Sequence, residues 1–436
     1  MKGILFNGLD KKQYYYSPKT GKIVSTQGKL VEDDLREEDF TFNFGSDRRM
    51  EEKYLDSQLD TLILEGTQDC NMRCSYCIYG GGYLGERNHN GWDMSPEIAF
   101  NSVEYFLAHS EEKKPFRFIS FYGGEPLVNF NLLERVVSSF QGAPRLRFGI
   151  STNGLLLERY ADFLKENNVS VVVSLDGPKE VHDKNRLTLG GKPTFEQVIR
   201  GVSAMGPDSI SKGSMAFSST ITHKDDFKKS YEFFRDNFRG CVARMEFVKG
   251  YDRIGNPGER LYLEEENIGK MFQDYKEGII TGDSVNTLRF LFDDMFKRIL
   301  VRPRDYSGGE INPGRTCLPG ARKLFCKPDG KFYICEKLGY DSFEIGSTEK
   351  GIDKDKVFKL MEFFMHVSQE ECSNCPLTQL CNVCIPVSGL SQGEFSSERY
   401  KKSCATKEKN IKMFLGMYVD LINDVGEERL LSYLGH

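Results

Sequence analysis

Three cysteines lie close together in the first fifth of the chain. Cys70, Cys74 and Cys77 occur in the stretch DCNMRCSYC and are separated by three and by two residues. A structural zinc site takes four protein ligands and leaves no open position. Three thiolates on a 4Fe–4S cluster leave one iron without a protein ligand, and that iron can bind a small molecule. The spacing favours such a cluster; an incomplete zinc knuckle that borrows a distant ligand is the alternative.

Short apolar runs that alternate with helical patterns must position this loop. They are TLILEGT (61–67), FRFISFYGG (116–124), RLRFGISTNG (145–154), VSVVVSLDGP (169–178), SMAFSSTIT (214–222) and VARMEFVKG (242–250). Ser95-Pro96 predicts the start of one helix, and Thr194 with Gln197 predicts a capping box at another. Buried strands that alternate with helices predict a parallel sheet. Six strands are fewer than the eight of a closed barrel, so we expect an α/β fold with an open, partial (β/α)6 TIM-like barrel.

The length of 436 residues suggests two or three domains. We expect a small N-terminal β-containing segment at 1–60, with a hairpin in QYYYSPKTGKIVST (13–26). The barrel would occupy 61–254 and a helical bridge 255–304. A cysteine-rich, cluster-binding domain would occupy 305–436 and close with a helix at about 405–432.

Composition excludes several classes of function. The net charge is −5, from 59 basic and 64 acidic residues, so nucleic acid is not an expected partner. No apolar run approaches the ~20 residues that span a bilayer, so no membrane partner is expected. The N-terminal MKGILFNGLDKKQYYY lacks the apolar stretch of a signal peptide, and we expect a cytoplasmic protein. The 12 cysteines then indicate metal ligation rather than disulfides.

The cysteine loop resembles a known family. CNMRCSYC matches the C-x3-C-x2-C signature of radical S-adenosylmethionine (SAM) enzymes, with the aromatic Tyr76 before the third cysteine. The resemblance implies that the open iron chelates the amino and carboxylate groups of SAM. It also implies that an electron from the reduced cluster breaks a C–S bond of SAM and yields a 5′-deoxyadenosyl radical. A flavodoxin or ferredoxin would then be the electron donor.

Motifs at the ends of later strands resemble the family's SAM contacts. In YGGEP, the resemblance assigns Gly123, Gly124, Glu125 and Pro126 to the amino group of SAM; read alone, the motif is equally a β-turn. Ser151, Thr152 and Asn153 offer hydroxyl and amide groups to ribose or carboxylate, and the resemblance assigns Ser174 and Arg186 to the methionine carboxylate. His182 and Asp183 are interpreted as helix-start structure. The run MAFSSTIT lacks the family's glycine-isoleucine-glycine pattern, which leaves the adenine contacts open.

Eight cysteines between Cys317 and Cys404 resemble the SPASM domain, which holds up to two auxiliary 4Fe–4S clusters in radical enzymes that modify peptides. The resemblance implies a nearer cluster on Cys317, Cys326, Cys335 and Cys384, and a farther one on Cys372, Cys375, Cys381 and Cys404. Cys326 lies outside the seven-cysteine pattern, and without it the nearer cluster would have an open iron. Cys381 and Cys384 are separated by two residues where the family has three. A zinc ribbon at Cys372 to Cys384 is the alternative.

The sequence therefore predicts a radical SAM/SPASM oxidoreductase with three 4Fe–4S clusters that installs a thioether or carbon–carbon cross-link in a ribosomally made precursor peptide. An auxiliary cluster would accept the electron released when the new bond closes. Glu336 and Asp176 are candidate proton acceptors, with a solvent-facing carboxylate and turn chemistry as the alternatives. Cys241 is interpreted as a buried apolar residue. The rival functions are a formylglycine-forming sulfatase-type maturase and a non-catalytic zinc-dependent peptide-binding protein.

Overall fold

The computed structural model describes residues 3–27, 41–45, 55, 58–80, 88–111, 115–239, 241, 243–247, 265–283, 286, 288–302, 310–311, 317, 319–338, 340–391 and 394–435. The chain forms two compact units. The barrel unit contains Arg48–Leu263 and Cys317–Leu360, and the helical unit contains Met1–Asp47, Glu264–Thr316 and Met361–His436. Each unit combines segments that are separate in the sequence, whereas the predicted domains are continuous segments with boundaries at 60, 254 and 304. The predicted domain boundaries stay a prediction.

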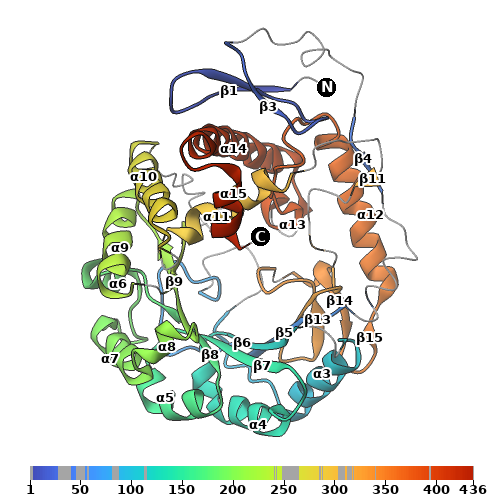
Figure 1. Ribbon diagram of the computed structural model, residues 1–436. Helices are drawn as coiled ribbons and strands as arrows, with labels where there is room; N and C mark the ends of the chain where they lie inside the picture. Colours follow the sequence, from blue (N-terminus) through green and yellow to red (C-terminus); the bar gives the residue numbers. More distant parts are fainter. Residues whose placement is uncertain are drawn as a thin grey trace. The chain divides into compact units, whose positions relative to one another are not determined.

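A parallel sheet forms the centre of the barrel unit (Figure 1). Its strands are β5 (Thr61–Thr67), β6 (Arg117–Gly123), β7 (Leu146–Thr152), β8 (Ser170–Ser174), β9 (Met215–Ile221) and β10 (Ala243–Phe247). Each pairs in parallel with the next in chain order. All six predicted strands are confirmed, although residues 242 and 248–250 of the last predicted run lie outside the described residues.

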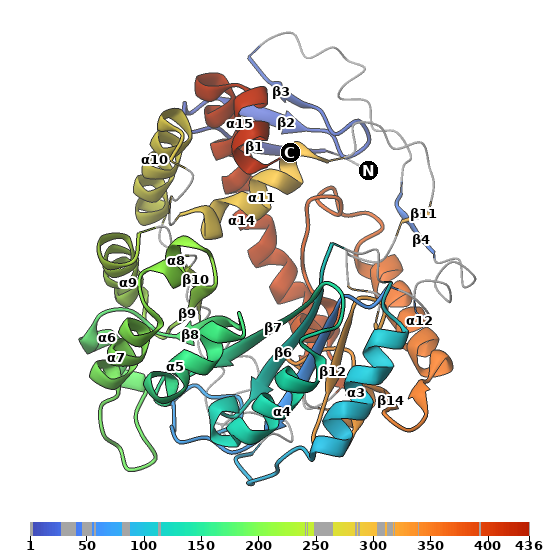
Figure 2. The same ribbon diagram turned by 60° about the horizontal axis from the view of Figure 1, so that its bottom comes forward.

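Helices cover the outer side of this sheet (Figure 2). They are α3 (Pro96–Ala108), η1 (Pro126–Asn129), α4 (Phe130–Phe140), α5 (Leu157–Glu166), α6 (Lys179–Asn185), α7 (Phe195–Met205), α8 (Asp208–Ser211) and α9 (Lys224–Asn237). The Ser95 hydroxyl accepts the N–H of Ile98, which confirms the predicted start of α3. The capping box predicted at Thr194 is wrong, because the Thr194 side chain does not cap α7. Asp183 Oδ1 instead accepts the N–H groups of Thr194 and Phe195 at 2.8 and 2.9 Å.

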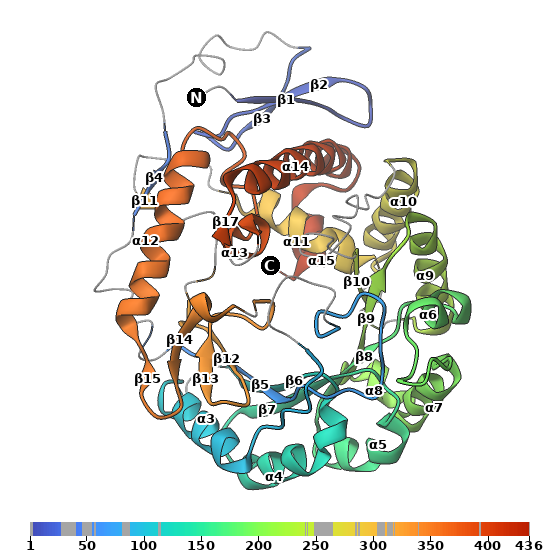
Figure 3. The same cartoon turned by 180° about the vertical axis from the view of Figure 1, so that it is seen from behind.

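Strands from the later part of the chain extend the same sheet beyond β5 (Figure 3). β12 (Lys323–Cys326) pairs in parallel with β5, with Lys323 opposite Thr61 and Cys326 opposite Leu64. β13 (Lys331–Tyr333), β14 (Glu344–Ser347) and β15 (Gly351–Ile352) follow as antiparallel neighbours, with η4 (Asp341–Phe343) before β14. Ile63, Phe325 and Tyr333 form a buried apolar cluster across β5, β12 and β13. The sheet runs from β10 to β15 and stays open, as predicted.

The helical unit contains a three-stranded antiparallel sheet of β1 (Ile4–Asn7), β2 (Gln13–Tyr16) and β3 (Ile23–Ser25). The β2–β3 pairing confirms the predicted hairpin. The remaining elements are β4 (Asn43–Phe44), α10 (Glu265–Thr281), α11 (Arg289–Leu300), β11 (Glu310–Ile311), α13 (Ile385–Gly389), β16 (Leu390–Ser391), β17 (Glu394–Phe395), α14 (Ser397–Val425) and α15 (Glu427–Leu434). α12 (Lys354–Glu371) contains the boundary between the two units.

The C-terminal helix differs from its predicted span of about 405–432. It begins earlier, at Ser397, because the Ser396 hydroxyl accepts the N–H of Arg399. It is interrupted at Gly426, whose φ of 84° does not continue a right-handed helix. Among the described residues, no helix combines the length and the apolar composition that crossing a bilayer requires.

Candidate functional site

The cysteine loop, defined here as residues 68–80, follows β5 at the edge where the parallel strands end. The end of β6 holds its first residues, since the N–H groups of Gly124 and Glu125 donate to Thr67 O and Asp69 O, both at 2.8 Å. A Cβ on Gly123 would lie 2.2 Å from Thr67 O, and one on Gly124 would lie 2.0 Å from Asp69 O. The two glycines therefore allow the loop and the strand to touch; contact with an ammonium stays a prediction.

The three thiols of the loop are half-buried, and the charges of Cys74 and Cys77 act on Cys70. Burial, together with the charges of Glu125, Cys74 and Cys77, raises the pKa of Cys70 to about 12. Burial likewise raises the pKa of Cys77 to about 11. Thiols of this kind lose their protons to a bound metal, and the thiolate is then stabilised by nearby N–H groups. Met72 and Tyr79 aim such N–H groups at the sulfurs of Cys70 and Cys77, both at 3.4 Å.

Asn153, the residue after β7, contacts the Cys70 thiol. Its Nδ2 donates to Asn71 Oδ1 at 2.7 Å and lies 3.5 Å from Cys70 Sγ. Its Oδ1 accepts the N–H of Leu155 at 3.0 Å, which fixes the orientation of the amide. Asn153 therefore helps to hold the Cys70 thiol in place, and its predicted contact with ribose or carboxylate stays a prediction.

Glu125 joins the ends of two strands. Its Oε1 accepts from the Thr152 hydroxyl at 2.8 Å and from the N–H of Leu127 at 3.0 Å, and its Oε2 accepts the N–H of Asn153 at 2.6 Å. The side chain is fully buried, and burial raises its pKa to about 7. Glu125 thus braces the strand ends that carry the loop; the expected contact between an ammonium and this carboxylate stays a prediction.

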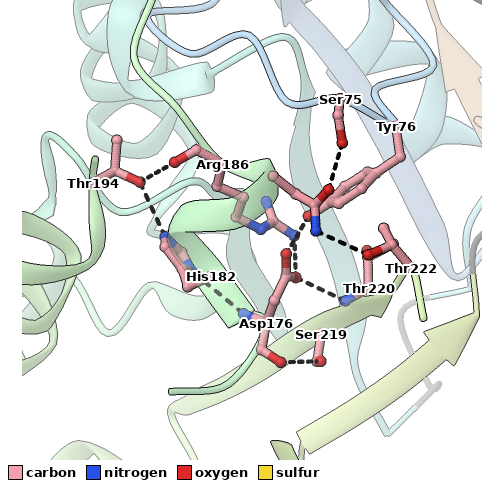
Figure 4. A network of polar contacts seen from close by, with 10 residues as sticks. Ser75, Tyr76, Asp176, His182, Arg186, Thr194, Ser219, Thr220 and Thr222 are labelled. Carbon is pink, nitrogen blue, oxygen red and sulfur yellow. Dashed lines mark hydrogen bonds and ion pairs between the residues drawn. The ribbon is translucent and has the colours of Figure 1, made fainter. Parts of the chain in front are cut away.

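Arg186 is held beside the loop by a buried ion pair (Figure 4). Its Nη2 lies 3.0 Å from Asp176 Oδ1, and Asp176 also accepts from the Tyr76 hydroxyl at 2.5 Å and from the N–H of Thr220 at 2.8 Å. The guanidinium stacks over the Tyr76 ring, 5.3 Å from its centre. Among the described residues, the buried Nε of Arg186 has no hydrogen-bond partner. This unused N–H suits a carboxylate such as that of SAM.

Asp176 therefore positions Arg186. It is completely buried, and the donors just described occupy its oxygens. The predicted role of Asp176 as a proton acceptor stays a prediction. The signal in the sequence was the short run SLDGP, which does not distinguish an exposed turn from a buried ion pair.

His182 contacts the residues that hold Arg186 in place (Figure 4). Its Nδ1 accepts the N–H of Asp176 at 3.4 Å, and its Nε2 lies 3.1 Å from the Thr194 hydroxyl, which donates to Arg186 O at 2.6 Å. These partners assign the proton to Nε2. Burial, together with the charge of Arg186, lowers the pKa of His182 to about 3. The structural interpretation of His182 is thereby supported, and the Thr194 hydroxyl is used here instead of at the cap.

A second polar chain connects the loop to β9 and α6. The Ser75 hydroxyl donates to Asn185 Oδ1 at 2.7 Å, and Asn185 Nδ2 donates to the Thr222 hydroxyl at 3.0 Å. Figure 4 shows Ser75 and Thr222 beside the Arg186 network. The half-buried Ser174 ends β8 and Ser151 lies on β7, while Pro126 begins η1. Cofactor contacts by these three residues stay predictions.

One set of buried polar contacts, which connects the two ends of the cysteine loop, was not predicted from the sequence. Glu65, on β5, is completely buried; it accepts from the Tyr79 hydroxyl and from Gln68 Nε2. His89 stacks on Tyr79, and its Nε2 lies 3.9 Å from Cys77 Sγ. Glu65 therefore connects the residues that begin and end the loop. A charged residue inside the apolar run TLILEGT was the available signal.

Four of the later cysteines lie close together in the helical unit. The charges of Cys372, Cys375 and Cys381 all act on the Cys404 thiol, whose pKa burial raises to about 12. Cys372 Sγ lies 3.6 Å from the Tyr400 hydroxyl, and Cys381 Sγ receives the N–H of Val383 at 3.4 Å. This is the set expected for the farther cluster.

The cysteines expected for the nearer cluster are placed differently. Cys317 is exposed and Cys335 is half-buried, while Cys326 is fully buried. Burial lowers the pKa of Lys323, but the charges of Glu336, Cys335 and Cys317 outweigh this effect and raise the pKa. The thiols of Cys335 and Cys317 therefore lie near the Lys323 ammonium. Cys384 is exposed and belongs to the helical unit.

Glu336, expected as a proton acceptor, forms an ion pair with Lys323 at 3.0 Å and accepts from Cys335 Sγ at 3.4 Å. Burial raises its pKa, but Lys323 outweighs this and holds the pKa below its usual value. Its catalytic role stays a prediction. Cys241 is buried and donates to Met215 O at 3.3 Å, in accord with its interpretation as a packing residue.

Comparison with known proteins identifies relatives. A family model described as the Radical SAM superfamily matches residues 64–215. The cysteine-type anaerobic sulfatase-maturating enzyme of Clostridium novyi is 27% identical over 352 residues, 74% of this chain and 86% of the relative. The radical SAM cyclopropyl synthase TigE of Paramaledivibacter caminithermalis is 23% identical over 77% of this chain and 69% of the relative. An uncharacterized protein of Methanocaldococcus jannaschii is 32% identical over 51% of this chain and 79% of the relative.

A solved structure has the same fold. Native anSMEcpe with bound AdoMet and the Cp18Cys peptide superposes with a TM-score of 0.62 at 23% identity, covering 84% of this chain and 98% of that one. The cysteine-rich C-terminal part of this chain fits a SPASM domain. With its three-cysteine loop at the end of the first barrel strand, the chain belongs to the radical SAM superfamily.

Proposed function

We propose that this protein is a peptide maturase that installs a thioether or carbon–carbon cross-link in a ribosomally made precursor peptide. The coarser conclusion, a radical SAM enzyme that acts on a peptide or protein substrate, follows from the family and the named relatives. SAM and one 4Fe–4S cluster are its cofactors. The proposal adds the kind of product, two auxiliary clusters, and a flavodoxin or ferredoxin as electron donor.

The chain's own residues prepare the site for these cofactors. Cys70, Cys74 and Cys77 would bind the first cluster, and Asn153 and Glu125 hold the loop that carries them. Arg186, fixed by Asp176, would bind the SAM carboxylate through its free Nε. A 4Fe–4S cluster held by these cysteines would supply the electron that splits SAM and yields a 5′-deoxyadenosyl radical. The buried pair and the packed strand ends keep water away from this region.

The observation that carries the proposal is the second group of thiols. Cys372, Cys375, Cys381 and Cys404 lie near one another, far from the first loop in sequence. Forming a new bond from a substrate radical releases one more electron, and an iron–sulfur cluster is a suitable acceptor. Four thiolates would ligate every iron of such a cluster, which favours electron transfer over the binding of a small molecule at an open iron.

The sulfatase-type reaction is the second candidate, because the Clostridium novyi relative is a sulfatase-maturating enzyme. It would convert one cysteine or serine to formylglycine. The two reactions differ in product: a cross-link joins two residues and changes the fragmentation of the peptide, whereas formylglycine carries an aldehyde that reacts with hydrazines.

The test uses anaerobically prepared protein, reductant, SAM and a candidate precursor encoded beside this chain. Wild type should form 5′-deoxyadenosine and a cross-linked peptide, detected by tandem mass spectrometry. The C70A/C74A/C77A variant should reduce both to background. C372A/C375A should retain cofactor cleavage and lose the finished product. A hydrazine-reactive product would replace the cross-linking proposal with the sulfatase-type one, and wild type without 5′-deoxyadenosine would contradict both.

A further inference from the structure

The connection from α6 to α7 forms a short hairpin at residues 187–193, called the α6–α7 hairpin below. At its base, the Thr194 hydroxyl donates to Arg186 O at 2.6 Å (Figure 4). Near its tip, the N–H of Gly191 donates to Thr188 O at 2.9 Å, and Gly191 has a φ of 73°, which favours glycine. The hairpin is therefore closed by hydrogen bonds at both ends and has a defined shape.

The α6–α7 hairpin pairs with the backbone of the cysteine loop. The N–H of Arg73 donates to Leu187 O at 2.8 Å, and the N–H of Leu189 donates to Asn71 O at 3.1 Å. The residues between these two bonds form an antiparallel bridge. The hairpin and the loop both belong to the barrel unit. The tip of the hairpin is therefore fixed next to the segment that connects the first two cysteines.

The tip of the hairpin presents apolar groups to solvent. Leu189 is 65% exposed, the largest value for a large apolar side chain among the residues that the structure describes. Gly190, Gly191 and Pro193 are exposed as well. A single exposed leucine is ordinary on a protein surface, so the position of Leu189 decides what its exposure means.

The cysteine loop reaches the surface beside the start of this hairpin. Ser75, the residue after Cys74, is exposed, and its N–H donates to Asn185 O at 3.0 Å, where α6 ends. The surface is thus one residue away from a predicted cluster ligand. The rate of electron transfer falls steeply with distance. A protein that covers Ser75 and Leu189 therefore brings its own redox group close to a cluster held by the loop.

The exposed charges of this region are positive. Of the charged residues at 68–80 and 181–193, only Lys184 and Lys192 are exposed, and Lys184 pairs with Asp226 at 3.1 Å. The aspartates of the two segments are half-buried and accept backbone N–H groups. The chain as a whole has a net charge of −5. This region therefore attracts an acidic partner that the rest of the surface does not.

We propose that Ser75, Lys184, Leu189 and Lys192 form the docking surface of a flavodoxin, which reduces the cluster on the cysteine loop. Protein interfaces combine an apolar centre with a polar rim, and here Leu189 supplies the centre and the two lysines supply the rim. The exposed edge of the flavin is an apolar dimethylbenzene ring, which fits Leu189, and acidic side chains around it pair with the lysines. One electron leaves the reduced flavin and enters the oxidised cluster, and no atom is transferred.

The first test compares two reductants on the anaerobically reconstituted protein. Dithionite is a small ion that needs no docking surface, whereas flavodoxin needs one. In L189D, the KM for reduced flavodoxin in 5′-deoxyadenosine formation should rise about tenfold, because the variant removes the apolar centre of the interface. The dithionite-driven rate should stay at its wild-type value. L9D, at an exposed leucine of the helical unit, serves as the matched control and should change neither value. An unchanged KM for flavodoxin in L189D, or an equal loss of rate with both reductants, overturns the proposal.

The second test examines the charges. In wild type, the KM for flavodoxin should rise with added potassium chloride, because salt screens the attraction between the lysines and the acidic donor. K192E should have a higher KM at low salt and a smaller rise with salt. K212E, at an exposed lysine that pairs with Asp208 on α8, should follow wild type. A K192E variant that follows wild type at every salt concentration overturns the proposal.

Two outcomes would assign the surface to another occupant and overturn the proposal. The first is a wild type that sedimentation shows to be a dimer and an L189D variant that is a monomer, which would assign the surface to a second copy of the chain. The second is an L189D variant that raises the KM for a ferredoxin but not for flavodoxin.

This inference rests on the proposed function only for its electron donor, so the two can fail separately. A higher KM for flavodoxin in L189D, without a cross-linked peptide from wild type, supports the docking surface and contradicts the proposed function. A cross-linked peptide together with an unchanged KM in L189D overturns the docking surface alone.

Discussion

The two groups of clustered thiols are supported in different ways. In the cysteine loop of the barrel unit, the supporting side chains come from distant strand ends: Glu125 after β6, Asn153 after β7 and Asp176 after β8. Around Cys372 to Cys404, much of the support is local. Cys372 donates its N–H to Ser368 O at 2.8 Å, and Cys375 donates to Cys372 O at 3.0 Å.

This difference in support predicts which of the two thiol groups can take its shape before metal binds. The loop is held by a sheet that buries its own apolar core, so its shape does not depend on metal. The second group begins directly after α12 and ends with Cys404 inside α14, and a metal bound there would contribute folding energy directly. We therefore expect the first site to be preorganised by the fold, and the second to depend more on the cluster proposed for it. The predictions below test this contrast.

The largest effect should come from D176N, because it leaves the buried Arg186 charge without its carboxylate. Breaking a buried ion pair costs about 3 kcal/mol or more. We expect a loss of that order in the free energy of unfolding and about a 100-fold lower rate of 5′-deoxyadenosine formation, since Arg186, proposed to bind the SAM carboxylate, is displaced. Urea unfolding and a single-turnover assay measure the two effects.

The matched control is E196Q, which removes the exposed Lys179–Glu196 pair of 2.7 Å on neighbouring helices. It should change neither stability nor cleavage measurably. Wild-type cleavage in D176N would contradict the idea that the barrel site depends on this network.

A medium effect should appear as pH dependence at His182. Its pKa is about 3 in the folded protein and 6.5 when unperturbed, so below pH 6.5 the unfolded state binds a proton that the folded state does not. This contribution to stability is complete above pH 6.5 and is lost as the pH falls toward 3. It amounts to about 3 kcal/mol by about pH 4.

The H182Q variant tests this contribution, because glutamine can donate and accept in the same directions but does not titrate. Its urea midpoint in metal-free protein should fall less steeply from pH 6.5 to about pH 4 than that of wild type. H366Q, at an exposed position of α12, should follow the wild-type slope. Parallel slopes for H182Q and wild type would contradict the assignment.

The smallest effect should come from Y400F in the second group. It removes the hydroxyl that lies 3.6 Å from Cys372 Sγ, and such a bond contributes about 1 kcal/mol. Cofactor cleavage and iron content should stay at wild-type values, while the melting temperature of the iron-loaded protein decreases slightly. A loss of cofactor cleavage comparable with that of D176N would show that the two groups are not independently supported.

Local pattern was sufficient to predict the strands and the loop. Each apolar run carries its own signal, and Ser95-Pro96 begins α3 through contacts within four residues. The cysteine spacing is also local. These features could therefore be predicted from neighbouring residues alone.

Features that depend on distant partners could not be predicted. The residues around Thr194 predict that its hydroxyl caps α7, but the hydroxyl contacts His182 and Arg186 and does not cap the helix. Asp176, predicted as a proton acceptor, and Glu125, predicted to contact an ammonium, are both completely buried, and their burial depends on packing between distant parts of the chain. The side to which Cys326 points follows from the register of β12 with β5, across more than 250 residues of chain.

The pairing of β12 with β5 also affects how the protein emerges from the ribosome. Lys323 must be synthesised before Thr61 acquires its neighbour on that side. Until then β5 is the bare edge of a nascent parallel sheet, and bare edges recruit other strands. Fragments that stop short of residue 323 should therefore aggregate, and the chain places a demand on chaperones throughout most of its translation.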